Sequence, residues 1–427
     1  GAFAVLLRWL DWRQAAAAAA AAIAFNLFVL PRAGGGHLLR EDDLKRGYPI
    51  GILLYPVVVL LLILAFRDRL ALAAAGWAYL AFGDGAATLF GTALGRARLP
   101  WNARKSWAGL AAYVVFGGSA AVLLYGFVSV RVPAPYEVGA LVFGAIVGAA
   151  AESLPSELDD NLVAPLVAAA AAGLAIRALA SPLTLLTLEF GKRAGVALAI
   201  NVAVALAAGF LGIVRPSGAA AGFVLGSLVY AFGGPKLYAL LWVFFAVGTV
   251  ATRYGRRRKE ALGKAEEAGG KRGAKNVLAN VSVPASFAVL SGLTADADLA
   301  KVFALASAAA FATALMDTVG TEVGQAIATP TVLLPDLARV PPGTDGAVSV
   351  AGTLGGLVAA GFLAAVAVDL GVVAPRGAAI VLVAAALGTV AESLLGRAGA
   401  PWRVTNGHVL NFYNTIVGAA AALAMAG

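Results

Sequence analysis

The sequence predicts an all-α fold: a polytopic membrane protein with about 14 transmembrane helices, arranged as two related helical domains. Hydrophobic residues make up 61% of the 427-residue chain and charged residues only 13%, and the mean hydropathy is +0.86. Apolar runs separated by short polar loops continue along the whole chain, and one ordered series of polar motifs occurs twice. This balance excludes a disordered chain and an ordinary soluble fold.

Several of the expected spans are shorter than the roughly 20 residues that a straight helix needs to cross a bilayer. Short or glycine-interrupted membrane segments are typical of broken helices that line a polar cavity. Alanine and glycine are abundant throughout, which favours closely packed helices. The expected spans are 15–30, 49–66, 72–82, 109–130, 138–151, 162–180, 194–214, 219–232, 237–252, 277–295, 302–316, 350–368, 372–391 and 409–426.

The scarce residue types limit the kinds of site that the chain can build. It has no cysteine, which excludes disulfide bonds and cysteine-based zinc sites. Its two histidines, His37 and His408, are too far apart along the chain to indicate a metal cluster. The net charge of +9 raises the question of nucleic acid, but the basic residues lie mostly in short loops between apolar runs, where such charge sets membrane orientation. We therefore expect no nucleic-acid partner.

Loop charge predicts which face of the membrane each loop occupies. When successive loops are placed on alternate sides, about two thirds of the 32 Lys and Arg residues fall on one side, which the positive-inside rule makes cytoplasmic. The polar motifs described below fall on that side too. We therefore expect an integral protein of the cytoplasmic membrane, in contact with membrane lipid, whose active sites face the cytoplasm. The basic segment 253–275 is either a solvated loop of that face or a contact for lipid headgroups or nucleotide.

The motif Gly83-Asp84-Gly85 follows an apolar run, and Lys105-Ser106 precedes the next one. A charged side chain at the end of a membrane segment is costly to bury and therefore indicates function. Glycine amides can approach a phosphate closely, and a Lys supplies a point charge for it. We expect Asp84 to bind Mg²⁺. A triphosphate would be bound by Gly83, Gly85, Lys105 and Ser106. The alternative is a glycine-rich packing turn followed by a solvated loop.

Four carboxylates occur close together between two expected spans, at Glu152, Glu157, Asp159 and Asp160. Hard oxygen donors at this density suit Mg²⁺, and the flanking prolines stiffen the turn. We assign Glu152, Asp159 and Asp160 to Mg²⁺ binding and to activation of a substrate hydroxyl, with Asn161 beside the nucleotide. The alternative is an acidic, solvated turn.

The second half of the chain repeats this order of motifs. Three spacings of about 240 residues separate the corresponding motifs, and near-constant spacing indicates two related domains, 1–188 and 189–427. An Asn-rich segment, 406–414, stands in place of the Asp-Asp-Asn turn. Residues 317–324 correspond to 83–91, residues 341–352 to 99–109, and 391–394 repeat the Ala-Glu-Ser-Leu sequence of 151–154.

Residues of about 40–190 resemble the CTP-dependent polyprenol kinases, the family of dolichol kinase and phytol kinase. The resemblance rests on Gly83-Asp84-Gly85, Lys105-Ser106 and Asp159-Asp160-Asn161. These kinases are distantly similar to phosphatidate cytidylyltransferase. The resemblance implies that the first domain phosphorylates an isoprenoid alcohol, with Mg²⁺ and with CTP or another nucleoside triphosphate.

Residues of about 190–427 resemble the phytyl-phosphate kinase family, and here the match is more specific. One departure is Thr321, where the family pattern has Ser; both side chains carry a hydroxyl. The resemblance rests on Arg215-Pro216-Ser217-Gly218, Gly222, Gly226, Phe244-Phe245, Thr249, Thr252, Asn276, Asn280, Asp317-Thr318, Glu322-Val323-Gly324, Pro342-Gly343-Thr344, Gly346 and Asn411.

Together the two resemblances imply consecutive reactions, in which an isoprenoid alcohol becomes its monophosphate in the first domain and its diphosphate in the second. A monophosphate acceptor is already nucleophilic at neutral pH, so the second site needs a base less than the first. In the second domain, Mg²⁺ would be held by Asp317, Glu322 and Glu392. Phosphates would be contacted by Lys271, Arg272, Asn276, Asn280, Thr344 and Asn411.

Two alternative functions stay open. The first half alone also fits cytidylyl transfer to a lipid phosphate, which releases pyrophosphate rather than CDP. Internal repeats, small residues and broken helices are transporter traits as well, although transporter sites lie near the midplane and these motifs gather at one face. No P-loop signature occurs in the sequence, so any nucleotide site is of another kind.

Overall fold

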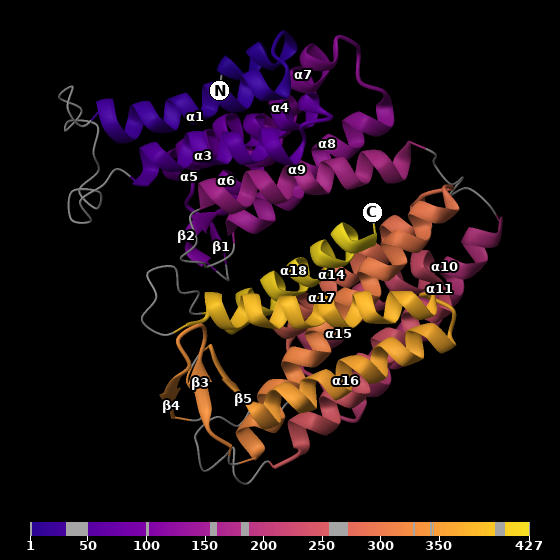
Figure 1. The fold of residues 1–427 in the computed structure, drawn as a ribbon. Coiled ribbons are helices and arrows are strands. Elements are labelled where there is room, and N and C mark those ends of the chain that lie inside the picture. The colour runs from indigo at the N-terminus through magenta and orange to yellow at the C-terminus, as the bar shows by residue number, and fades with distance from the viewer. Residues whose placement is uncertain are drawn as a thin grey trace. The chain divides into compact units, whose positions relative to one another are not determined.

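The structure is a computed structural model. It describes residues 2–30, 50–99, 102–153, 160–180, 188–255, 272–327, 329–341, 344, 346–397 and 406–426. At residues 2, 50, 51 and 160 it describes the backbone alone. Its contacts divide the chain into two compact units, Gly1–Ala180 and Ser181–Gly427, close to the boundary expected at 188. Within the described residues, 12 helices are long and apolar enough to cross a membrane. The predicted all-α membrane fold is confirmed (Figure 1).

The first unit contains two long helical runs, 70–93 and 107–129, and each run includes a π-helical turn in its middle. The runs consist of α4 (Leu70–Ala78), η4 (Tyr79–Gly83) and α5 (Asp84–Ala93), and of α6 (Trp107–Ala112), η5 (Tyr113–Gly117) and α7 (Gly118–Ser129). The other helical elements of the unit are η1 (Ala2–Arg8), α1 (Trp12–Ala24), η2 (Phe25–Val29), α3 (Ile50–Ala65), α8 (Pro135–Ser153) and α9 (Asp160–Leu179).

The π turns η4 and η5 lie against each other because glycine lets the backbones approach. A Cβ placed at Gly117 would lie 2.9 Å from the Cα of Gly83, and a Cβ placed at Gly83 would lie 3.0 Å from the ring of Tyr113, which is fully buried. Isolated π turns are frequent at functional sites. Asp84 follows η4 directly, so this crossing positions the first candidate carboxylate.

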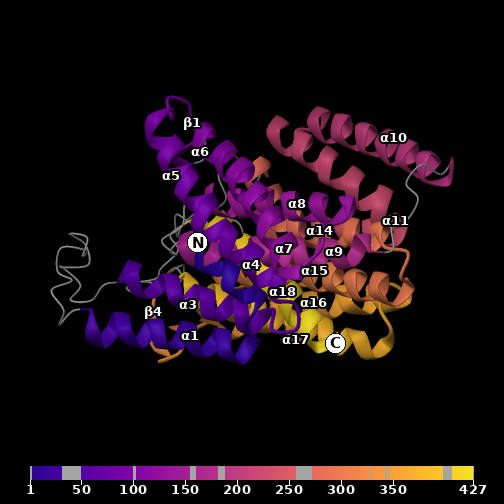
Figure 2. The same ribbon diagram turned by 90° about the horizontal axis from the view of Figure 1, so that it is seen from above.

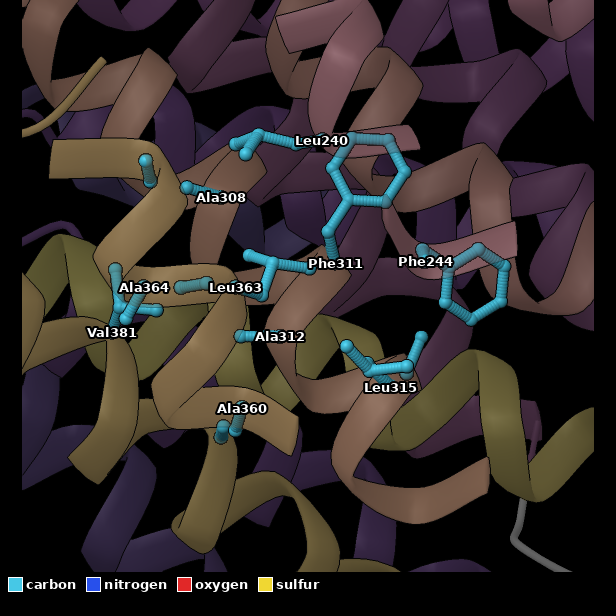
Figure 3. Close-up of a cluster of buried hydrophobic side chains, with 14 of the residues drawn as sticks. Leu240, Phe244, Ala308, Phe311, Ala312, Leu315, Ala360, Leu363, Ala364 and Val381 are labelled. Carbon is cyan, nitrogen blue, oxygen red and sulfur yellow. The ribbon is translucent and has the colours of Figure 1, made fainter. Parts of the chain in front are cut away.

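The second unit is organised around α15 (Ala297–Ala326), whose middle is buried along its whole circumference. α15 packs against α11, α14, α16, α17 and α18, and its many alanines allow these close approaches. Figure 3 shows Phe311 and Leu315 of α15 among Leu240, Phe244 and Leu363 from its neighbours. The helices are α10 (Leu188–Phe210), α11 (Pro216–Arg253), α14 (Ala274–Leu293), α16 (Val350–Asp369), α17 (Pro375–Leu395) and α18 (Gly407–Ala426).

The expected count of about 14 spans differs from the 12 found, for two reasons. Helix α3 is apolar but its described part, Ile52–Ala65, is short. The expected spans 219–232 and 237–252 form the single element α11, which is broken at Gly234 (φ 75°, ψ −178°), a conformation that favours glycine. Gly218 and Gly248 both lie against Arg272, whereas a straight helix would separate them by about 45 Å, so α11 reverses direction at this break.

Two small antiparallel sheets occur where the all-α prediction expected loops. In the first unit β1 (Arg98–Leu99) pairs with β2 (Asn102–Ser106). In the second unit the strand order is β4 (Ala338–Val340), β3 (Thr331–Leu333), β5 (Ala347–Ser349). The last strand of each sheet runs directly into a helix, α6 or α16.

Candidate functional site

A cavity of about 220 Å³ lies in the first unit beside the β1–β2 hairpin. The hairpin contributes three basic side chains, Arg98, Arg104 and Lys105, and α8 contributes Glu152. Cationic side chains together with hydroxyl and backbone donors are what binds phosphate groups in proteins. The rest of the wall consists of Ala87, Thr88, Gly91, Thr92, Leu99, Ser106, Gly109, Leu110, Ala149 and Ser153.

Lys105 and Glu152 form an ion pair in this cavity, with Lys105 Nζ 2.9 Å from Glu152 Oε1. The carboxylate is buried, while the Lys side chain keeps 30% of its surface exposed. A buried carboxylate needs such a partner, because an unpaired charge there would be costly. The structure therefore brings Lys105, Glu152 and Ser106 into one place, as the sequence predicted, and leaves the Lys accessible to a ligand.

Two hydrogen bonds hold the hairpin in position over the cavity. Asn102 Nδ2 donates to the backbone oxygen of Ser153 at 3.1 Å, which ties the hairpin to the end of α8. The hydroxyl of Ser106 accepts from the backbone N–H of Gly109 at 3.2 Å and so caps α6. This capping role occupies the Ser106 hydroxyl as an acceptor and leaves its proton to donate to a ligand.

Asp84 is the first residue of α5 and is half-buried. Residues three and four positions apart share a helix face, so Asp84 lies one turn from Ala87 and Thr88 of the cavity wall. The distance from Asp84 to the end of the helix at Ala93 is about 13 Å. Asp84 therefore lies below the cavity, on the face that leads into it.

The expected phosphate-binding turn at Gly83 and Gly85 is corrected by the structure. Both glycines lie inside the continuous helical run 70–93, where the backbone N–H groups are used by the helix itself; the N–H of Asp84, for example, bonds to the oxygen of Tyr79. Gly83 serves the close crossing with Tyr113, and a Cβ at Gly85 would meet nothing within 4 Å. These amides are not available to bind a triphosphate.

Some predicted residues lie outside the described part of the chain. They are Asp159 and Lys271. Asp160 begins α9, but its side chain is not described, and Asn161 follows it with a half-buried side chain. The acidic magnesium site expected around Asp160 therefore stays a prediction.

In the second unit, three helices bring together a pair of carboxyl groups and an amide. Asp317 of α15 and Glu392 of α17 are within hydrogen-bonding reach of each other, and Asn414 of α18 reaches both. Asn414 Nδ2 donates to Glu392 Oε2 at 2.8 Å, and Asn414 is fully buried. Thr321 Oγ1 lies 3.5 Å from Asp317 Oδ1. Two carboxyl groups in contact need a shared proton or a bound cation between them.

This arrangement changes the expected set of metal ligands. Glu322 is buried and close enough to act on Asp317 electrostatically, but the contact partner of Asp317 is Glu392. Asn414 was not among the predicted residues, although it lies in the Asn-rich segment that the repeat singled out. Only the packing of α18 against α15 and α17 reveals its role.

The donor atoms at this position suit a hard cation such as Mg²⁺. Two carboxyl groups supply oxygen ligands, and Asn414 Oδ1 has no hydrogen-bond partner among the described residues although it is buried. Among all the residues that the structure describes, no three or more His, Cys, Asp or Glu side chains lie close enough together to hold a metal ion. An amide oxygen would therefore have to complete the set of protein ligands around the metal ion.

The predicted phosphate-binding amides form a ladder between α14 and α18. Asn411 Nδ2 donates to Asn280 Oδ1 at 3.3 Å, and Asn280 Nδ2 donates to the backbone oxygen of Asn276 at 2.9 Å. Asn280 is buried and its amide nitrogen and oxygen are both engaged. Its observed role is to join the two helices, while the half-buried Asn276 and Asn411 lie nearer the surface.

Arg272 lies between α11 and α15, at the start of α14. Its guanidinium packs over the rings of Phe244 and Phe245, with 5.3 and 5.8 Å to the ring centroids. A Cβ placed at Gly248 would lie 2.7 Å from Arg272 Nη2 and 3.6 Å from Thr318 Cγ2. The guanidinium therefore lies within a few ångströms of the residue that follows Asp317.

The Arg-Pro-Ser-Gly segment fixes the backbone at Arg272. The N–H of Arg215 donates to the oxygen of Arg272 at 3.1 Å, and the hydroxyl of Ser217 accepts from the N–H of Ala274 at 3.3 Å. A Cβ at Gly218 would lie 2.2 Å from that same Arg272 oxygen, so only glycine fits. Arg272 is thus held from two sides, by the start of α11 and by Gly248 near its end.

Thr344 lies in the segment that leads into β5, where its hydroxyl donates to the oxygen of Pro341 at 2.7 Å. The sheet is attached to the end of α17 in two ways. Arg397 Nη2 pairs with Asp336 Oδ2 at 2.6 Å, and a Cβ at Gly346 would lie 2.7 Å from the oxygen of Ser393. Thr344 is therefore carried by a sheet that is anchored beside Glu392.

Comparison with known proteins gives a family. The profile of the family described as integral membrane protein DUF92 matches residues 197–405. An uncharacterized membrane protein of Synechocystis is 36% identical over 214 residues, which cover 49% of this chain and 82% of the relative. Protein VTE6, chloroplastic, of Arabidopsis thaliana is 35% identical over 215 residues, or 49% of this chain and 64% of the relative.

A third relative carries the name of an enzyme. The probable chloroplastic phytol kinase of Triticum aestivum is 30% identical over 133 residues, which cover 30% of this chain and 43% of the relative. The chain thus spans less than two thirds of the length of VTE6 and of this kinase. No solved structure matches the chain.

Proposed function

We propose that this chain, which belongs to the DUF92 family of integral membrane proteins, is a lipid kinase. It transfers the γ-phosphoryl group of a nucleoside triphosphate, preferably CTP, to an isoprenoid alcohol and then to the resulting monophosphate. The relatives named phytol kinase support the isoprenoid substrate, and the two sets of motifs support two transfers. The observation that carries the proposal is the cavity that three basic side chains line together with the buried carboxylate of Glu152, which is paired with Lys105.

In the first transfer, Arg98, Arg104 and Lys105 bind the triphosphate, and Ser106 donates a hydrogen bond to it. Asp84, on the helix face below the cavity, accepts the proton of the substrate hydroxyl. The hydroxyl oxygen forms a bond to the γ-phosphorus, the bond from that phosphorus to the bridging oxygen breaks, and the nucleoside diphosphate leaves. Positioning and charge neutralisation supply most of the acceleration in such a reaction.

In the second transfer, the acceptor is a phosphate oxygen of the isoprenoid monophosphate. Arg272 binds that phosphate, because its guanidinium lies beside Thr318, the neighbour of Asp317. The acceptor oxygen forms a bond to the γ-phosphorus, and a nucleoside diphosphate leaves again. The product is an isoprenoid diphosphate.

Asp317, Glu392 and the Oδ1 of Asn414 would hold Mg²⁺ in the second unit. Bound Mg²⁺ would neutralise the charge that develops on the transferred phosphoryl group. In the first unit, Asp84, Glu152 and Asp160 are the proposed ligands, with Lys105 already balancing the charge of Glu152. Both sites face the cytoplasm, where the nucleotide is found, and the protein resides in the cytoplasmic membrane.

The test uses the full chain, purified in detergent, with Mg²⁺, geranylgeraniol or phytol, and CTP labelled either at the γ- or at the α-phosphate. The kinase account predicts that γ-label appears in the lipid monophosphate and then in the diphosphate, with CDP as the other product. Label entering lipid from the α-position, with release of pyrophosphate, would instead identify a cytidylyltransferase. No nucleotide turnover with any alcohol or monophosphate would contradict the proposal and favour a transporter.

A further inference from the structure

Each unit carries a threonine four residues after its candidate aspartate. In the first unit Thr88 follows Asp84 on α5. In the second unit Thr321 follows Asp317 on α15. Residues four positions apart share one face of a helix, so each hydroxyl lies one turn, about 6 Å, along the helix from its carboxylate.

A glycine three residues after each threonine shows that the two helical turns occupy equivalent places. A Cβ placed at Gly91 would lie 3.4 Å from the hydroxyl oxygen of Ser106, and a Cβ placed at Gly324 would lie 2.8 Å from that of Ser349. These serines cap α6 and α16. Along its own helix, each threonine therefore lies between the aspartate and the turn that contacts a serine-capped helix.

Thr88 is exposed and lines the cavity of the first unit. Helix α5 packs against α6, and Figure 2 shows the two helices side by side near β1. Of the other α5 residues in the wall, Ala87 and Gly91 carry no polar side chain, and the hydroxyl of Thr92 donates to the backbone oxygens of Thr88 and Leu89 at 2.9 Å. Within the described residues, Thr88 is thus the wall residue of α5 whose hydroxyl no backbone oxygen engages.

Thr321 is also exposed, whereas Asp317 is half-buried one turn earlier, so the hydroxyl lies between the carboxyl pair and the surface. The oxygen of this hydroxyl is 3.5 Å from Asp317 Oδ1. A strong hydrogen bond between two oxygens is about 2.7–2.8 Å long, so this contact is weak. A phosphoryl oxygen that lies closer would therefore accept the hydrogen bond instead.

The order of groups along α5 matches the order of groups in the proposed reaction. Asp84 comes first, Thr88 lies one turn on, and the next turn contacts Ser106, the neighbour of Lys105. In the proposed transfer Asp84 accepts the proton of the substrate, and the basic side chains bind the triphosphate. The γ-phosphoryl group passes between these two places, at the level of Thr88. Its negative charge is spread over three oxygens in the transition state, so a hydrogen-bond donor there lowers the barrier.

We propose that Thr88 and Thr321 are catalytic residues, each of which donates a hydrogen bond from its hydroxyl to the γ-phosphoryl group that its unit transfers. This inference rests on the proposed function, because it adds one contact to each of the two transfers. Each threonine keeps its proton, so the bonds that form and break stay those of the phosphoryl transfer. The acceptor differs between the two units but the transferred group is the same, which matches a hydroxyl that occurs in both.

The test measures kcat and KM of the full chain in detergent, with CTP labelled at the γ-phosphate and either geranylgeraniol or geranylgeranyl monophosphate as acceptor. Thr88→Val removes the hydroxyl but keeps the shape of the side chain. It is expected to lower kcat for the alcohol about 100-fold with little change in KM for CTP. Thr321→Val is expected to have the same effect on the monophosphate reaction, so the ratio of the two rates shifts in opposite directions in the two variants.

Thr88→Ser and Thr321→Ser are the matched controls, because serine keeps the hydroxyl and loses only a methyl group. Both are expected to retain most of the wild-type kcat. Wild-type kcat in the valine variants would overturn the inference, and so would equal losses in the valine and serine variants. A loss in the valine variants that disappears at higher Mg²⁺ would also overturn it, since the threonine would then only orient a metal ligand.

The wild-type chain separates this inference from the proposed function. Transfer of γ-label by the wild-type chain, with unchanged kcat in both valine variants, would retain the kinase and overturn the role of the two threonines. Absence of transfer by the wild-type chain would contradict the kinase, and the inference with it.

Discussion

The two units place a carboxylate at the same point of a similar framework but give it different partners. In each, a strand leads into a helix capped by a serine, Ser106 or Ser349, whose hydroxyl accepts from a glycine N–H at 3.2 or 3.1 Å. In each, the sheet is attached at the serine of the Ala-Glu-Ser-Leu sequence. The Glu of that sequence pairs with Lys105 in the first unit and with Asp317 and Asn414 in the second.

The difference gives one framework two different arrangements of charge. In the first unit a protein cation already balances Glu152, so the remaining basic side chains are available for a polyanion such as a triphosphate. In the second unit the position corresponding to Lys105 is the apolar Val348, and the carboxyl pair lacks a basic partner from that strand. A carboxyl pair of this kind favours a divalent cation.

Packing beneath the two sites differs in a complementary way. In the first unit Gly83 lies against the ring of Tyr113, and both helices contain a π turn at this level. In the second unit Met316 precedes Asp317 and lies against Gly356, and α15 and α16 are regular. In the first unit the small residue is on the first helix of the crossing and the large residue is on the second. In the second unit this order is reversed, so the two helices still pack closely.

The largest effect is expected from the ion pair that distinguishes the first unit. Lys105→Met removes the cation that is paired with the buried Glu152 and is expected to lower the unfolding free energy by about 3 kcal/mol, measured in mixed detergent micelles. Lys105→Met combined with Glu152→Gln is expected to recover most of this stability but not the phosphorylation of alcohol. Recovery of activity in the double variant would show that Lys105 is only structural.

The amide that distinguishes the second unit is expected to act on metal affinity. Asn414→Leu removes an oxygen from the carboxyl pair and is expected to raise the Mg²⁺ concentration needed for half-maximal phosphorylation of the monophosphate by about 10- to 100-fold. Phosphorylation of the alcohol serves as the internal control and is expected to keep its Mg²⁺ dependence. An equal shift in both reactions would argue against separate metal sites.

The exchanged packing residues predict a compensating pair of substitutions. Gly83→Met forces a side chain against Tyr113 and is expected to cost about 1–3 kcal/mol of unfolding free energy. Gly83→Met with Tyr113→Gly imitates the second unit and is expected to cost less than the sum of the two single changes. If the double variant instead loses the sum of the two single losses in the same detergent assay, the helix crossings of the two units are not equivalent.

The smallest effects are expected where the sheets are attached. Asn102→Ala removes the bond to Ser153 and is expected to cost about 1 kcal/mol and to raise KM for the nucleotide, because the hairpin carries the basic side chains. Arg397→Gln breaks a partly exposed ion pair with Asp336 and is expected to cost less than about 1 kcal/mol. A larger loss of unfolding free energy for Arg397→Gln than for Asn102→Ala would contradict this ranking.

The sequence predicted the membrane fold, because apolar runs are visible in it directly, and its repeated motifs singled out residues that the structure places close together, such as Lys105 and Glu152. The ion pair between Lys105 and Glu152 was not predicted, because the sequence assigned Lys105 to the triphosphate and Glu152 to Mg²⁺. The glycines at Gly83 and Gly85 were misread as a turn, because the π turn η4 carries the helix past the end of the apolar run. The short strands were missed because segments of two to five residues give no clear alternation.

Asn414 shows what a sequence alone does not reveal. It lies within an expected span, and its position beside Asp317 and Glu392 depends on how three helices pack. The same holds for the position of Arg272, whose contacts with Gly218 and Gly248 join the two ends of α11. Long-range packing of this kind leaves no local pattern in the chain.

The most direct test of two separate sites is the product pattern of two variants, Asp84→Asn and Asp317→Asn, supplied in turn with geranylgeraniol and with geranylgeranyl monophosphate. The account predicts that Asp317→Asn converts the alcohol to monophosphate and stops there. Asp84→Asn is expected to leave the alcohol unchanged but still to convert the monophosphate to diphosphate. Loss of both reactions in both variants, with each protein folded, would contradict the account and indicate a single shared site.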